Sequence, residues 1–148
     1  PTLHLDNMVD LPIKDRMTDS VDALKYFTLA SYKRGFEDQM NNLLKAVEID
    51  EKFAQAHTYL YGECRMNQDA ECYSKHMGLA LKYINRLDDG MKFLVRIDAL
   101  LGQSQGNEQK NKLVNMWMEL YPDDIIGKYY FSGSLLLLKE KIYYCLNQ

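Results

Sequence analysis

The chain has 148 residues, 47% hydrophobic and 26% charged, a balance typical of one folded globular domain rather than a disordered segment. Its net charge is −3 and Lys and Arg are spread along the chain, which argues against nucleic acid as a partner. The longest strongly apolar run, residues 135–138, is too short to cross a bilayer, so we expect no membrane insertion.

Residues 1–17 have no clear period and contain Pro12, so we expect an extended lead-in there. Helical spacing begins directly after Thr18 and Ser20, whose hydroxyls can cap a helix N-terminus. The first helix is expected to stop at Gly35, because glycine readily ends helices.

Six further helices follow from apolar residues that recur at intervals of three and four. The first ends near 48–50, and the others cover about 52–66, 70–86, 88–101, 108–120 and a stretch from 123 or 124 through 135. Asp88 and Asp123 suit helix starts, because acidic residues complement the positive end of the helix dipole. No segment shows strand alternation bounded by turns, so the sequence predicts an all-α fold.

An internal repeat is visible at the junctions between these helices. Residues 45–56 end one helix, turn sharply and start the next with small residues at alternate positions, and residues 119–127 repeat that layout. That offset of 71 residues is about two repeat lengths, and Ala46 and Ala80 lie 34 residues apart, each where the second helix of a pair needs a small side chain. A two-helix unit cannot bury both of its apolar faces alone, so we expect it to stack on copies of itself.

At these residues the chain resembles the tetratricopeptide repeat family. Ala46 with Glu51, and Trp117 with Pro122, have the spacing of the Ala and Pro at the end of the family's second helix, each pair retaining one of the two. The resemblance implies a right-handed superhelix of about three stacked antiparallel helix pairs plus a final helix. It implies a helical repeat domain over residues 18–148 after the lead-in.

Three residues depart from the family pattern: Glu51 stands for the Pro, Trp117 for the Ala, and Gln39 for an earlier small residue. An indole cannot occupy the space of a methyl group, so the third pair must pack more loosely there or meet a different neighbour. More narrowly, residues 18–24, 46–56 and 119–124 resemble tetratricopeptide segments attached to bacterial signalling proteins, such as winged-helix regulators, nucleotide cyclases and kinases.

The chain carries three cysteines, Cys64, Cys72 and Cys145, an odd number in a chain too large to need disulfide staples. We therefore expect free thiols and a reducing compartment, the cytoplasm, although a periplasmic protein can also carry unpaired thiols. The first residue is Pro1 rather than Met, which indicates a fragment of a longer protein.

No constellation of residues indicates catalysis, a cofactor or a metal. Cys72 and His76 share one helix face and Cys64 lies one helix earlier, but a metal site requires three or four converging ligands. We interpret them as a buried thiol beside a surface histidine, and His57 as structural. The loop 102–107 lacks the Lys-Ser/Thr that completes a phosphate-binding loop. We expect no enzymatic activity and no cofactor.

Surface residues remain as candidates for function. In tetratricopeptide arrays the first helix of each pair lines the concave face, where peptides or helices dock. This geometry implies six partner-binding residues: Gln55, Thr58, Arg65, Lys92, Arg96 and Tyr129. The three basic residues would form a patch able to hold a carboxylate or an acidic segment through charge-assisted hydrogen bonds. The alternative is that these are ordinary solvated residues on helix faces.

The C-terminal stretch, residues 139–148, is rich in Tyr and lacks the polar cap of a solenoid end. Either the parent protein continues there, or two copies pack as a homodimer. The resemblance implies a non-catalytic module that binds a protein or peptide in its groove, within a bacterial signalling protein. The alternative is an accessory domain that positions a catalytic domain outside this fragment.

Overall fold

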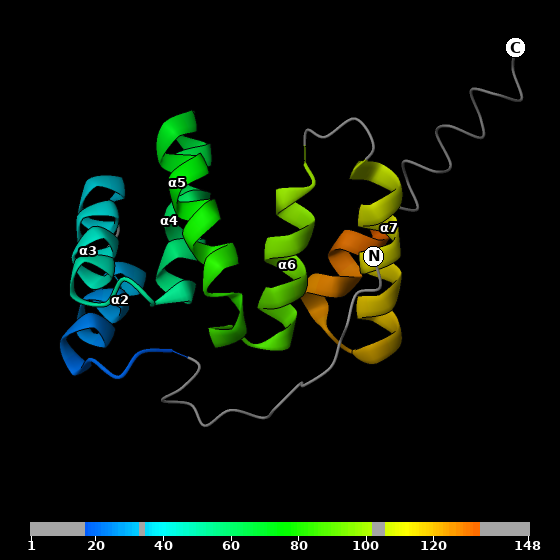
Figure 1. The fold of residues 1–148 in the computed structure, drawn as a ribbon, viewed down its shortest axis with the longest axis horizontal. Coiled ribbons are helices and arrows are strands. Elements are labelled where there is room, and N and C mark those ends of the chain that lie inside the picture. The colour runs from blue at the N-terminus through cyan, green and yellow to red at the C-terminus, as the bar shows by residue number, and fades with distance from the viewer. Residues whose placement is uncertain (1–16, 33–34, 102–105, 134–148) are drawn as a thin grey trace, which may run out of the picture. The chain divides into compact units, whose positions relative to one another are not determined.

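The computed structural model describes residues 17–32, 35–101 and 106–133 (Figure 1). These residues form helices and turns with no strand among them, which confirms the all-α prediction. Most of the predicted lead-in, Cys145 and the Tyr-rich stretch 139–148 lie outside the described residues. The chain divides into two compact units, residues 1–95 and 96–148.

The first unit is built from helical hairpins. Its elements are α2 (Val21–Tyr32), α3 (Phe36–Ile49), α4 (Ala54–Met66), α5 (Ala70–Lys82), the short 3-10 helix η1 (Ile84–Arg86) and most of α6 (Asp89–Ala99). Helix α2 packs against α3, α3 against α4, and α4 against α5 (Figure 1). Short turns join successive helices, so each helix runs back along the one before it.

Capping side chains set the starts of several helices. The Ser20 hydroxyl accepts a hydrogen bond from the backbone N–H of Ala23 (3.2 Å), which confirms the predicted start of α2. The Asp88 carboxylate accepts one from the N–H of Met91 (2.9 Å) at the start of α6. These bonds satisfy backbone donors that have no partner within the helix.

Other helix limits differ from the prediction. Gly35 is the N-cap residue of α3 rather than the end of the preceding helix, and α2 ends at Tyr32. The stretch expected as one helix over 70–86 breaks at Tyr83 into α5 and η1. The tighter 3-10 turn precedes extended backbone at Leu87, whose side chain is buried. Burial of Leu87 accompanies a break that local helical spacing did not indicate.

Buried positions in the first unit recur at the interval that separates Ala46 from Ala80. Four further pairs that relate the two hairpins at this spacing consist of two buried side chains: Ala23 and His57, Phe27 and Tyr61, Ala30 and Cys64, and Leu43 and Met77. The pairs that begin with Ala23, Phe27 and Ala30 relate α2 to α4, and the others relate α3 to α5. The two hairpins therefore bury residues at matching positions.

Aromatic side chains join the two hairpins. The ring of Phe27 on α2 lies 4.9 Å from that of Phe53, which precedes α4, and 5.2 Å from that of Tyr59 on α4, measured between ring centroids. Such tilted and edge-to-face pairs stabilise packing beyond the area that they bury.

The second unit contains the end of α6, α7 (Gly106–Leu120) and the helical residues 125–133. Trp117 is fully buried in it, 6.2 Å from the Tyr130 ring. Gly127 lies against the indole, and a Cβ atom there would come within 3.3 Å of it. The indole thus fits because the facing residue has no side chain, so Trp117 meets a different neighbour, one of the two outcomes expected above.

Enlarging a repeated small residue should destabilise the first unit. Ala80→Leu inserts three carbon atoms where helices are in close contact, and we expect it to lower the free energy of unfolding by about 1–3 kcal/mol. Ala70→Leu, at an exposed position of the same helix, is the matched control and should change it by less than about 0.5 kcal/mol. Urea denaturation followed by circular dichroism measures both, and equal effects would contradict the proposed close contact.

Candidate functional site

Three of the six predicted partner-binding residues lie on α4 and differ in exposure. Gln55 is half-buried and Arg65 is exposed in the last turn. Thr58 is only 6% exposed, and its hydroxyl donates a hydrogen bond to the Ala54 carbonyl (3.0 Å). Thr58 therefore offers a partner little surface, whereas Arg65 is exposed.

The other three predicted residues are divided between the two units. Lys92 belongs to the first and pairs through Nζ with Asp89 Oδ1 at 3.0 Å, which partly neutralises the predicted basic patch. Arg96 and Tyr129 belong to the second unit. Tyr129 is 75% exposed, and its ring meets that of Tyr130 edge to face at 5.8 Å.

A buried pair of histidines lies between α4 and α5. The Nδ1 atoms of His57 and His76 are 2.9 Å apart, and the rings stack with centroids 5.2 Å apart. His57 Nε2 lies 2.8 Å from the backbone oxygen of Glu51 in the turn before α4. His76 was expected at the surface from the sequence. That prediction is wrong, because the side chain faces α4 rather than solvent.

The partners of these rings determine where their protons lie. A carbonyl oxygen only accepts, so His57 Nε2 carries a hydrogen and donates it to Glu51. In a neutral ring His57 Nδ1 is then an acceptor, and His76 Nδ1–H donates to it. Two neutral imidazoles, one donating through Nδ1–H and one accepting, satisfy this arrangement.

The surroundings of the pair oppose protonation. Burial lowers the pKa of His76 to about 4, and the charges of a protonated His57 and of Lys75 act in the same direction. Burial also lowers the pKa of His57, although its hydrogen bond to the Glu51 carbonyl acts against this. A protonated His57 would place a second hydrogen between the two Nδ1 atoms. The pair is thus suited to holding α4 and α5 together at neutral pH.

A disulfide joins Cys64, in the last turn of α4, to Cys72, in the first turn of α5, with Cα atoms 5.6 Å apart. The expectation of free thiols is therefore wrong for these two cysteines. The cysteine count is odd, but the α4–α5 turn brings two of the three together. Closing so short a loop is worth about 2.5 kcal/mol of stability in the chain-entropy account.

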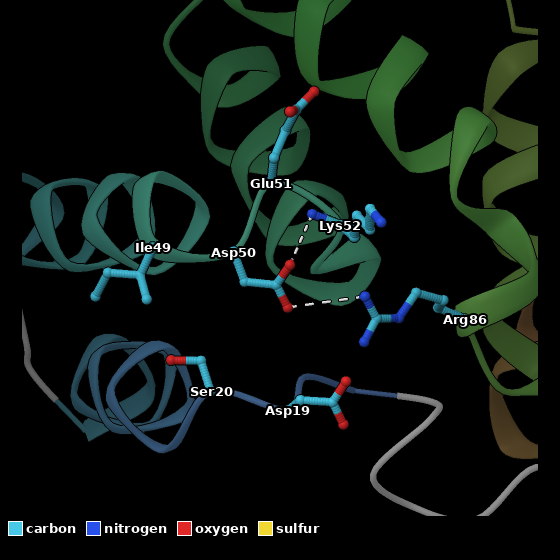
Figure 2. A pocket seen from close by; sticks show the side chains of 7 residues that line it. All are labelled: Asp19, Ser20, Ile49, Asp50, Glu51, Lys52 and Arg86. Atoms are coloured by element: carbon cyan, nitrogen blue, oxygen red, sulfur yellow. Dashed lines mark hydrogen bonds and ion pairs between the residues drawn. The ribbon is translucent and has the colours of Figure 1, made fainter.

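An open depression of about 610 Å³ lies beside the turn between α3 and α4 (Figure 2). Its lining residues come from the segment before α2, the end of α3 with the turn that follows it, and η1: Asp19, Ser20, Ile49, Asp50, Glu51, Lys52 and Arg86. Asp50 lies at its centre, where Oδ1 accepts a hydrogen bond from the Lys52 backbone N–H (2.9 Å) and Oδ2 accepts one from the Thr18 hydroxyl (2.6 Å). Arg86 Nη1 is 3.8 Å from Oδ2.

The Asp50 carboxylate thus holds together the start of the first hairpin, the turn between hairpins and the end of the second. A group with this many internal partners serves the fold rather than a ligand. Asp50 was not among the predicted site residues, and its position at the turn after Ala46 was the one signal available.

The described residues hold no cluster of three or more His, Cys, Asp or Glu side chains placed to bind a metal ion. Nor does any helix within the described ranges have the length and apolar character needed to cross a membrane.

No family model matches the chain, and neither the curated proteins nor the solved structures contain a match to it. Its function is therefore inferred from the geometry of its own residues.

The histidine pair predicts acid sensitivity. Because both pKa values lie below 6.5 in the folded state, the unfolded chain takes up protons first as the pH falls. The contribution of the pair is therefore complete above pH 6.5 and is lost toward pH 4, by at most about 1.4 kcal/mol per pH unit for each proton. Unfolding free energy measured by urea titration between pH 7 and pH 4 tests this.

The matched control is His76→Gln, whose amide can still donate to His57 but does not titrate near neutrality. We expect a steeper loss of stability in the wild type than in this variant, since the effects of carboxylates are common to both. Parallel curves would show that the pair does not cause the acid sensitivity.

Removing the Asp50 carboxylate should destabilise the first unit. We expect Asp50→Ala to lower the free energy of unfolding by about 1–3 kcal/mol, because the Thr18 hydroxyl and the Lys52 N–H lose their acceptor. The stability of Asp50→Asn should fall between those of the wild type and Asp50→Ala, since its amide oxygen can replace one of the two acceptors but neither the second acceptor nor the charge. The control is Asp19→Ala, because Asp19 is an exposed residue of the same depression. If the Asp50 variants unfold in urea at the same concentration as Asp19→Ala, the role given to Asp50 is contradicted.

Proposed function

We propose that this chain is a non-catalytic helical-repeat module, of the tetratricopeptide type, that holds a protein or peptide partner. The observation that carries the proposal is the recurrence of buried positions at one fixed interval over two successive hairpins. Repeats of this kind stack in one direction and leave one face of their helices for binding.

The unburied face of the first helix of each hairpin favours binding. On α2, Val21 and Tyr32 are 81% and 80% exposed, and on α4 Met66 is 78% exposed. Tyr and Met are enriched at interfaces, where a ring or a flexible thioether fits different partner surfaces. A face that carries these residues is better suited to a polypeptide than to a small polar substrate.

The buried polar groups favour binding over chemistry. The hydroxyls of Thr18 and Thr58 donate within the fold, and His57 and His76 bond to each other. Buried Asp98 in the second unit accepts from the Tyr130 hydroxyl at 3.2 Å. Each of these groups has a partner that stabilises the helices, so none is presented as an acid, base or nucleophile to a cavity.

The charged residues suggest the chemistry of the partner. Arg65 lies exposed at the end of α4, beside the exposed Met66, and Arg96 is half-buried in the second unit. Guanidinium groups bind carboxylates through paired hydrogen bonds. We propose that the partner is an acidic protein segment, and that this chain is part of a bacterial signalling or regulatory protein.

Charge reversal tests this proposal. The purified protein, immobilised, is used to capture partners from extract of its native cells, and the same is done with Arg65→Glu and Arg96→Glu. We expect each variant to retain at least about tenfold less of the captured partner, because a carboxylate at either position repels an acidic segment. Far-UV circular dichroism should be unchanged.

Lys75→Glu is the charge-matched control, since Lys75 is exposed on α5, the second helix of its hairpin. It should retain the partner as the wild type does. An equal loss of captured partner with Lys75→Glu would indicate general attraction to a charged surface. Unchanged binding by both Arg variants would show that neither Arg65 nor Arg96 takes part in binding.

A further inference from the structure

The Cys64–Cys72 disulfide lies at an accessible edge of the α4–α5 hairpin. Cys64 is fully buried and Cys72 is half-buried. Every residue between them from 65 to 71 is exposed. A thiol reagent or a reductant protein can therefore approach the sulfur of Cys72, while that of Cys64 is shielded by the helices.

The turn that brings the two cysteines together is closed by backbone hydrogen bonds. The Asp69 N–H donates to the Cys64 carbonyl (2.9 Å), and the Gln68 N–H donates to the Arg65 carbonyl (3.1 Å). Gln68 has φ 59°, a left-handed conformation that residues with a side chain seldom adopt. The backbone hydrogen bonds keep the two sulfur atoms close when the disulfide is reduced. The unfavourable φ of Gln68 favours a change in the conformation of the turn once the disulfide no longer constrains it.

The rest of the hairpin does not depend on the disulfide. The rings of Tyr61 and Tyr73 meet edge to face with centroids 5.8 Å apart, and the histidine pair joins α4 to α5 further along. On α5, Met77 and Ala80 are also buried and contribute packing that does not involve the disulfide. The hairpin therefore remains folded in the dithiol state, so the disulfide can be broken and remade in the native protein.

The position of Cys72 favours exchange. It is the third residue of α5, where the positive end of the helix dipole stabilises a thiolate, although the capping Asp69 carboxylate partly offsets this. A stabilised thiolate is a better leaving group in thiol–disulfide exchange and is more abundant as an attacking group in the reverse direction.

We propose that Cys64 and Cys72 form a reversible dithiol–disulfide site that exchanges with a cellular dithiol or glutathione-type thiol and sets the order of the α4–α5 turn. A thiolate of the reductant attacks the Cys72 sulfur, forms a mixed disulfide and expels the Cys64 thiolate, which takes up a proton. The second thiol of a dithiol reductant, or a second glutathione molecule, as thiolate, then attacks the reductant sulfur bonded to Cys72 and releases the Cys72 thiolate. Two electrons pass to the protein, and the reductant leaves as a disulfide.

The consequence for binding rests on the proposed function, whereas the exchange does not. Arg65 and Met66 directly follow Cys64 at the end of α4. Reduction of the disulfide should make the C-terminal end of α4 less ordered. This should lower the affinity for a partner that binds Arg65, because the side chain is then held less firmly in position. The disulfide form is then the state that binds, and the dithiol form is the state that releases.

Exchange is measured in a Cys145→Ser background, so that only the two cysteines of the pair react. The folded protein is equilibrated in buffers of graded ratio of reduced to oxidised glutathione, starting once from the disulfide and once from the dithiol. Acid quenching, alkylation with N-ethylmaleimide under denaturing conditions and intact mass then separate molecules with no adduct from those with two. We expect both starting states to converge on the same distribution, which shifts with the glutathione ratio.

The single variants show which sulfur is attacked. With Cys64→Ser, we expect Cys72 to take up glutathione in oxidised glutathione at least tenfold faster than Cys64 does with Cys72→Ser. A pair that stays reduced at every ratio, or that stays oxidised in the folded protein under excess dithiothreitol, would overturn the proposal. Equal reaction rates of the two single cysteines would overturn the assigned order of attack.

Hydrogen exchange tests the effect on the turn. Reduction should speed amide exchange of residues 65–71 by at least fivefold and leave the α2–α3 hairpin unchanged. Identical amide exchange in the disulfide and dithiol states would contradict the claim that the disulfide orders the α4–α5 turn. These readouts need no partner, so a failure of the proposed binding function leaves them interpretable, and loss of captured partner on reduction tests the link between the two.

Discussion

The close contact of helices at small buried side chains is the constraint on which the first unit depends. Ala23, Ala30, Ala46, Ala56 and Ala80 are all buried where one helix lies against the next. Two helices can approach closely only where such residues meet, and each hairpin must then place its other apolar residues around that contact. The fixed interval between equivalent buried positions follows, because it is the length of one hairpin with its turns.

Polar interactions are arranged around this packing rather than within it. Asp50 links three turns at the edge of the first unit, and its neighbour Glu51 accepts the His57 N–H through its carbonyl oxygen. The histidine pair is therefore attached to the same turn that Asp50 organises. Loss of the pair in acid should thus be felt at the junction between the hairpins as well as within the second one.

The α4–α5 hairpin contains both groups that respond to solution conditions, the disulfide and the histidine pair. The disulfide lies at its turn, the histidine pair lies toward the opposite end of α4, and Tyr61 contacts Tyr73 between them. A helix held at both ends by groups that respond to reductant and to acid can present Arg65 in more than one state. This is the structural basis on which regulated binding is proposed.

Local features of this protein follow from its sequence alone. Helical periodicity indicated the helices, Ser20 and Asp88 indicated their starts, and the spacing of Ala46 and Ala80 indicated equivalent buried positions. These features depend on residues three or four apart, or on a small side chain that any close helix contact requires. The break at Tyr83 was not predicted, because the apolar spacing continues through it.

Contacts between helices were decided only by the tertiary structure. His76 was expected at the surface and Cys64 and Cys72 were expected unpaired, yet His57 bonds to His76 and Cys64 to Cys72 across the α4–α5 interface. Gly127 facing Trp117 is a further example. Such pairs depend on how two helices are rotated and offset against each other, and that is set by the packing of all their side chains together.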